Sequence, residues 1–270
     1  MKYLYLILIL ISVTSCTEVV DVKLDTANPK LVVEASINWQ KGTAGNIQKI
    51  ILTSTADYYT NKTPVVSNAT VTVSNSLNVV FNFIETPNTG QYICNNFIPV
   101  INETYKLTIV SNGKTYTATE TLKPIAKIET IIQDSNGGFT NDQIQVNANF
   151  IDPVATEDFY LFKYEYPNTI KPDIYVTEDA FYNGNPFFSQ SFKDNLKTGD
   201  VIKITHFGVS KQYFKYLEIL LSISGNNGGG PFQSPPVTVR GNVINQTNQD
   251  DFPFGYFNLS EIDSKTYTIQ

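Results

Sequence analysis

One histidine and a few acidic side chains are the residues of this sequence that could carry acid–base chemistry. His206 is the single histidine of the chain and lies between a run typical of a strand and a run typical of a helix. A metal site with several histidine ligands is therefore excluded, and His206 could bind a metal only beside carboxylates. The sequence contains no G-x-S-x-G, no H-E-x-x-H and no phosphate-binding glycine loop with its lysine. We interpret His206 as a structural, hydrogen-bonded side chain.

Two acidic stretches offer oxygen ligands. Residues 134–137 read Asp-Ser-Asn-Gly and are followed by Asn141-Asp142, a set of side chains that suits calcium. The spacing and terminal glutamate of an EF-hand are absent, so a hairpin loop rich in turn-forming residues is the favoured interpretation. Asp250-Asp251 is a second pair of the same kind. Two carboxylates could also serve a glycosidase, and a sequence does not report their separation.

Aromatic side chains gather in stretches that otherwise resemble loops or hairpins. Exposed rings could stack on a sugar or fill a pocket of a partner protein. The alternative is that these rings anchor long loops onto a sheet. The single arginine stands near prolines and suits a carboxylate or phosphate, with a structural ion pair as the alternative. The candidate ligand or partner surface is Phe181, Tyr182, Phe187, Phe188, Phe232 and Arg240.

The first sixteen residues have the anatomy of an export signal. Lys2 precedes the apolar run Leu4–Val13, which is too short to span a bilayer. Val13-Thr14-Ser15-Cys16 resembles the bacterial lipobox, so we predict removal of residues 1–15, lipidation of Cys16 and a tether over residues 16–30. An ordinary signal peptide is the alternative. If Cys16 carries lipid, Cys94 has no disulfide partner and is predicted to be a buried, inert thiol.

Composition narrows the class of protein. The formal net charge is −6, the pI is about 4.9, and no basic cluster is present, so binding to nucleic acid is set aside. Aromatic residues reach 13% while charged residues are only 16%, which is typical of an exported β protein. No cofactor is expected.

The elements that would position these residues are mainly strands. Period-two alternation recurs between turn signals, including Asn112-Gly113, a strong hairpin signal. Over residues 31–123 this pattern predicts an immunoglobulin-like or transthyretin-like β-sandwich. Its seven predicted strands are residues 31–37, 47–53, 69–73, 79–83, 91–94, 105–109 and 116–122.

A second, β-rich domain with one α-helix is predicted over residues 124–270. Ser210 is a good N-cap for a helix at about residues 210–224, where apolar residues recur on one helical face and Gly225 follows. We expect this helix to pack on a sheet rather than to lie on a membrane. The predicted strands of this domain are residues 128–132, 143–150, 159–166, 173–177, 201–205, 237–243, 255–258 and 266–269.

Several stretches, taken in order, carry a resemblance to a known family. Residues 29–35 (PKLVVEA), 177–184 (TEDAFYNG) and 199–204 (GDVIKI) are followed by the helix, and then by residues 230–243 and 255–257. Together they resemble the domain-of-unknown-function family 4249 of Bacteroidota lipoproteins, over nearly the whole mature chain. The resemblance implies a predicted outer-membrane lipoprotein that is often encoded beside a TonB-dependent receptor. It carries over no catalytic residues.

The expected function is therefore non-catalytic. The sequence and the resemblance favour a lipid-anchored outer-membrane protein, on either face of that membrane, acting as an accessory or binding subunit of a TonB-dependent β-barrel receptor. A small-molecule or glycan ligand fits this role. The first alternative is a structural or assembly factor for outer-membrane or cell-surface complexes, and the second is a hydrolase that uses carboxylates.

Overall fold

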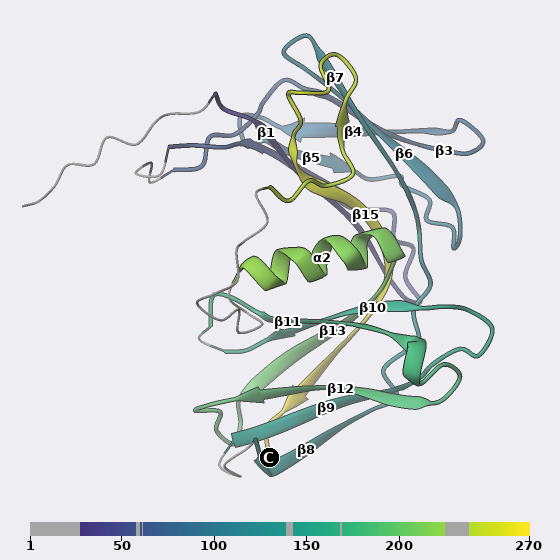
Figure 1. The fold of residues 1–270 in the computed structure, drawn as a ribbon, viewed down its shortest axis with the longest axis vertical. Helices are drawn as coiled ribbons and strands as arrows, with labels where there is room; N and C mark the ends of the chain where they lie inside the picture. The colour runs from purple at the N-terminus through teal and green to yellow at the C-terminus, as the bar shows by residue number, and fades with distance from the viewer. Residues whose placement is uncertain (1–27, 58–59, 61, 139–142, 168, 225–237) are drawn as a thin grey trace, which may run out of the picture.

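A computed structural model describes residues 28–57, 60, 62–138, 143–167, 169–224 and 238–270. The fold is mainly β, as predicted, with one α-helix among the described residues (Figure 1). No helix in this part of the chain combines the length and the apolar character needed to cross a membrane.

The first half of the chain is a curled sheet around one core. All seven strands predicted for it are present, with ends that differ by a few residues. Their neighbour order is β1-β2-β5-β4-β3-β6-β7. In β6, Tyr105, Leu107 and Ile109 are fully buried while Lys106 is exposed, so the predicted alternation positions the core side chains. The strands are β1 (Leu31–Gln40), β2 (Gln48–Ser54), β3 (Thr70–Asn75), β4 (Val80–Thr86), β5 (Gln91–Cys94), β6 (Thr104–Ser111) and β7 (Lys114–Thr121).

The long final strand, β15 (Phe254–Thr268), joins the two halves of the molecule. Its first part pairs in parallel with β1, and its last part pairs antiparallel with β13 (Val201–Val209). A parallel bridge between Lys123 and Ser260 brings the chain just after β7 against β15, so the curled sheet nearly closes on itself. One strand therefore belongs to both cores and ties their packing together (Figure 1).

The second half has three layers. The middle layer is the end of the large sheet, in the order β11-β10-β13-β15, and the lower layer is the small sheet β12-β9-β8 (Figure 1). Between these sheets lies a core that includes Phe150, Tyr160, Phe162 and Ile204. The strands not yet bounded are β8 (Thr130–Gly137), β9 (Gln143–Ile151), β10 (Phe159–Glu165), β11 (Asp173–Glu178), β12 (Pro186–Lys193) and β14 (Ile244–Asn245), and the short 3-10 helix is η1 (Asp179–Phe181).

The predicted helix is α2 (Lys211–Ile223), which forms the third layer on the other face of β10. Ser210 is its N-cap, and the Ser210 hydroxyl accepts a hydrogen bond from the Tyr213 backbone N–H. Phe214 and Leu217 pack with residues of β10 and β13 in a third apolar cluster. The expectation that the helix packs on a sheet is confirmed.

Near the C-terminus, one predicted strand is absent from the described residues, and two others are joined into one. The described part of residues 237–243 forms no strand, because the Asn242 side chain bonds both backbone groups of Phe257 and replaces backbone pairing. The predicted strands at 255–258 and 266–269 are one continuous strand, β15. Polar residues such as Ser260 and Glu261 interrupt its apolar pattern although they are buried.

The core of the first half also includes residues from the C-terminal part of the chain. Val243, Phe257 and Leu259 lie in the core of the first half, although they follow the second half in sequence. The cause is the parallel pairing of β15 with β1, which returns the C-terminal chain to the first sheet.

Candidate functional site

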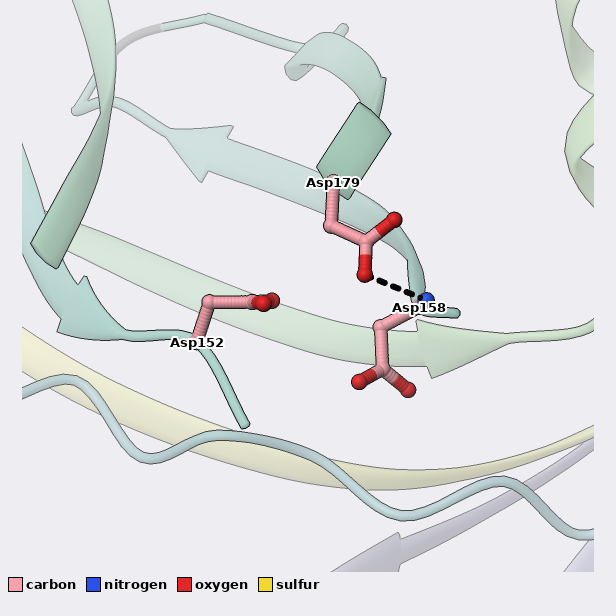
Figure 2. A group of neighbouring side chains, drawn as sticks. All are labelled: Asp152, Asp158 and Asp179. Carbon is pink, nitrogen blue, oxygen red and sulfur yellow. Dashed lines mark hydrogen bonds between the residues drawn. The ribbon is translucent and has the colours of Figure 1, made fainter. Parts of the chain in front are cut away.

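Three aspartates converge at one corner of the second half. Asp152 follows β9, Asp158 precedes β10, and Asp179 begins η1 directly after β11. One carboxylate oxygen from each lies within 4.8 Å of the others (Figure 2). Asp152 and Asp179 are each only 2% exposed. We call this group the acidic clasp.

Hydrogen bonds fix the acidic clasp in place. Asp152 accepts from the Tyr160 hydroxyl at 2.6 Å and from the Gly184 backbone N–H at 2.9 Å. Asp179 accepts from the Asp158 backbone N–H at 2.9 Å (Figure 2). These bonds tie β9, the start of β10 and the hairpin between η1 and β12 to one another. The clasp therefore sets the conformation of that hairpin.

The electrostatics of the acidic clasp are unfavourable to three negative charges. Burial raises the pKa of Asp158, and the neighbouring carboxylates of Asp152 and Asp179 raise it further. No ion pair joins the clasp to a lysine or arginine within the described residues. A cavity of about 200 Å³ reaches Asp158 from the junction of the two halves. Carboxylate oxygens at this spacing could hold a hard divalent cation such as Ca²⁺, or could share a proton.

The predicted aromatic surface separates into buried and exposed rings. Tyr182 is buried and stacks face to face on Phe187, with ring centres 3.7 Å apart. Phe181 is 99% exposed at the end of η1, and Phe188 is 42% exposed on β12. The stretch with Phe187 and Phe188 is a strand, which the sequence did not predict. Phe232 lies outside the described residues.

Two further apolar side chains lie beside the exposed rings. Ile151 is the register partner of Pro186 at the start of β12, and Val154 lies against Gly184. Both are more than half exposed. We call Ile151, Val154, Phe181 and Phe188 the apolar rim. The acidic clasp holds the elements that carry these four residues, so the two features form one candidate site.

Arg240 lies elsewhere, at the junction of β1 and β15. Its guanidinium carbon is 3.9 Å from the ring centre of Phe252, and the ion pair considered as an alternative is not found within the described residues. Cys94 is buried, as predicted, while Cys16 lies outside the described residues.

His206 is structural, but it is not hydrogen-bonded as expected. The ring is fully buried and stacks on Phe162 with centres 3.9 Å apart, and neither nitrogen has a partner of standard geometry among the described residues. Burial lowers its pKa to about 3, and the nearby backbone of Ala126 offsets this only in part.

The two acidic stretches noted in the sequence form no carboxylate cluster in the described part of the chain. Residues 134–137, predicted as a hairpin loop, are instead the end of strand β8, which has a register irregularity between Asp134 and Gly137; Asp134 accepts from the Asn136 backbone N–H there. Asn141 and Asp142 lie outside the described residues. Asp251 forms an ion pair with Lys114 at 2.7 Å.

Three solved structures show distant similarity to the chain. A family 4785 domain-of-unknown-function protein from Legionella pneumophila is 10% identical with a TM-score of 0.28, covering 65% of this chain and 52% of its own. A two-domain fibronectin type-III segment of chicken tenascin is 13% identical with a TM-score of 0.23, covering 67% and 91%. A pullulanase from Anoxybacillus is 14% identical with a TM-score of 0.21, covering 65% and 24%. The chain thus spans about half the length of the Legionella protein.

No curated protein matches the chain significantly. A family profile does match it, over residues 17–266, which is nearly the entire length. The chain belongs to the family described as domain of unknown function DUF4249.

Proposed function

We propose that this protein is a non-catalytic, lipid-anchored outer-membrane lipoprotein that serves as an accessory subunit of a TonB-dependent receptor. The observation that carries the proposal is the apolar rim. Phe181 is 99% exposed and Val154 is 79% exposed, on neighbouring segments that the acidic clasp holds together, and apolar patches on a surface are typical of a protein interface.

The position of the apolar rim supports docking from a membrane anchor. The first described residues of β1 lie at the upper left of Figure 1, and η1 lies at the lower right. A protein held through Cys16 by its N-terminal tether would present the rim away from the attachment point. A neighbouring outer-membrane β-barrel with extended loops is a partner that this geometry suits.

The acidic clasp supports a rigid docking surface. The bonds of Asp152 and Asp179 order the hairpin before any partner binds, so little conformational entropy is lost on association. Their carboxylates are occupied by these bonds, which favours a positioning role over hydrolysis.

The test is purification of the tagged, full-length protein from its native membrane in a mild detergent. We expect one TonB-dependent receptor to co-purify, and Phe181→Ser together with Phe188→Ser to remove it. The matched control is Ile84→Ser, because Ile84 is 69% exposed on β4 in the other half of the molecule. Recovery of assembly or secretion components instead of a receptor would favour the structural alternative. Cys16→Ala should move the protein to the soluble fraction.

A further inference from the structure

Two cations converge on one aromatic ring where the described chain begins. The Lys30 Nζ lies 3.6 Å from the ring centre of Phe252, and the Arg240 guanidinium carbon lies 3.9 Å from it. Cation–π contacts of this length hold both side chains in place. We call Lys30, Arg240 and Phe252 the cationic pair and its ring.

The backbone around the cationic pair is also fixed. The Lys30 N–H donates to the Thr55 hydroxyl, and the Lys30 carbonyl accepts from the Thr55 backbone N–H, each at 2.9 Å. Two residues after Arg240, Asn242 bonds both backbone groups of Phe257 on β15. The two positive charges are therefore preorganised rather than carried on loose segments.

Neither cation is neutralised by an acidic side chain. Within the described residues, no carboxylate lies within ion-pair distance of Lys30 or Arg240. Asp251, the acid next to Phe252 in sequence, is paired with Lys114. A chain of net charge −6 thus holds two like charges against one ring, an arrangement that an external anion would stabilise.

The location of the cationic pair indicates the source of that anion. Lys30 is the last residue of the predicted tether, and the chain from Cys16 to Lys30 spans at most about 50 Å when fully extended. A lipid on Cys16 keeps this end of the molecule within reach of the membrane surface. This step depends on the proposed anchor.

We infer that Lys30 and Arg240 bind anionic phosphate headgroups of the membrane in which Cys16 is anchored, and that this contact orients the protein. The ring of Phe252 beside the two charges is partially exposed, and aromatic side chains are favoured at the level of the headgroups. The apolar rim is then directed away from the lipid surface, toward a neighbouring protein.

The experiment uses the full-length lipidated protein, reconstituted in nanodiscs of phosphatidylcholine alone or with about one third phosphatidylglycerol. The rate at which an amine-reactive reagent acetylates Lys30 is measured by mass spectrometry, relative to exposed Lys106 on β6 as an internal reference. An anionic leaflet favours the charged form of a nearby lysine by about fivefold. We therefore expect the acetylation rate of Lys30 to be at least about fivefold lower in the anionic discs. Addition of ~0.5 M NaCl should abolish the difference.

Substitutions test whether Lys30 and Arg240 act together. Arg240→Gln should reduce the protection of Lys30 in anionic discs, because one of the two charges that hold this end of the protein on the anionic surface is lost. The control is Lys215→Gln, since Lys215 also stacks on a ring, Phe214, at 5.0 Å but lies on α2. It should leave the protection unchanged.

Each outcome decides a separate point. Equal Lys30 rates in both lipids, with the protein bound to the discs, would overturn the headgroup contact and leave the anchor standing. Failure to associate with either disc would overturn the anchor and, with it, this inference. Protection by millimolar inorganic phosphate in neutral discs, equal to that in anionic discs, would indicate a site for free phosphate and overturn the membrane contact.

Discussion

Buried His206 makes the stability of the second half depend on pH in a predictable direction. In the unfolded chain this imidazole has an ordinary pKa of 6.5, and burial lowers the folded value to about 3. The unfolded state therefore binds one more proton between these values. The stabilisation is complete above pH 6.5 and is lost as the pH falls toward 3.

The magnitude follows from the size of the shift. Each pH unit below 6.5 costs about 1.4 kcal/mol of the free energy of unfolding, so about 2 kcal/mol is lost at pH 5. The limiting loss near pH 3 is about 5 kcal/mol, comparable with the whole stability of many domains. Burial also raises the pKa of the Glu120 carboxyl, so His206 is not the only buried group that contributes to the pH dependence. Comparing the wild type with a His206 variant at each pH cancels the contribution of Glu120, because both proteins contain it.

The perturbation is His206→Phe, measured by urea unfolding at pH 7 and pH 5. The ring stack on Phe162 is retained, and two unpaired nitrogens are removed from the core, so we expect the variant to match or exceed the wild type at pH 7. At pH 5 it should exceed the wild type by about 2 kcal/mol more than at pH 7. Should the larger ring fit poorly, His206→Leu tests the same pH dependence. Equal pH slopes in wild type and both variants would refute the reasoning.

Four further substitutions test the fold and the site. Gly255 and Gly199 have similar backbone φ angles, +92° and +94°, but a Cβ at Gly255 would lie 1.9 Å from a backbone carbonyl of β1 while a Cβ at Gly199 meets open space. Measured by chemical denaturation, Gly255→Ala should lower the free energy of unfolding by well over 3 kcal/mol and Gly199→Ala by about 1 kcal/mol. Equal losses would contradict the close pairing of β15 with β1. Asn242→Ala should lower the free energy of unfolding by about 2 kcal/mol in the same assay, because two backbone groups of β15 lose their hydrogen-bond partner. A loss near zero would contradict a stabilising role for these two bonds. Asp158→Asn should raise the melting temperature at pH 7 in the presence of a chelator, since a carboxyl with a raised pKa loses stability as the pH rises; a lower melting temperature would contradict the repulsion.

Local pattern was enough to predict the strands of the first half. In β6, buried Tyr105, Leu107 and Ile109 alternate with more exposed neighbours, and such alternation is visible without tertiary information. The helix was equally visible, because Ser210 caps one apolar face. The unpredicted strand β12 begins at Pro186 and follows a glycine-containing turn, which resembles a loop in sequence.

The pairing of strands that are far apart in the sequence could not be predicted from local sequence patterns. The parallel contact of β15 with β1 joins residues more than 200 positions apart, and buried polar residues such as Ser260 conceal the strand. The acidic clasp was missed for a related reason, since Asp152 and Asp179 are far apart in sequence. One signal was available for two of the three aspartates: Asp158 and Asp179 stand at facing ends of the antiparallel neighbours β10 and β11, whereas Asp152 follows β9 of the other sheet.

Site-specific photo-crosslinking in native membranes tests the proposed role most directly. A benzophenone side chain replaces Phe181 on the apolar rim or, as the matched control, Ile84 on the outer surface of β4, both of which are exposed. Docking through the rim predicts that irradiation links position 181, and not position 84, to a single outer-membrane TonB-dependent receptor. A crosslink of equal yield from both positions, or none from position 181 to any β-barrel receptor, would contradict the account.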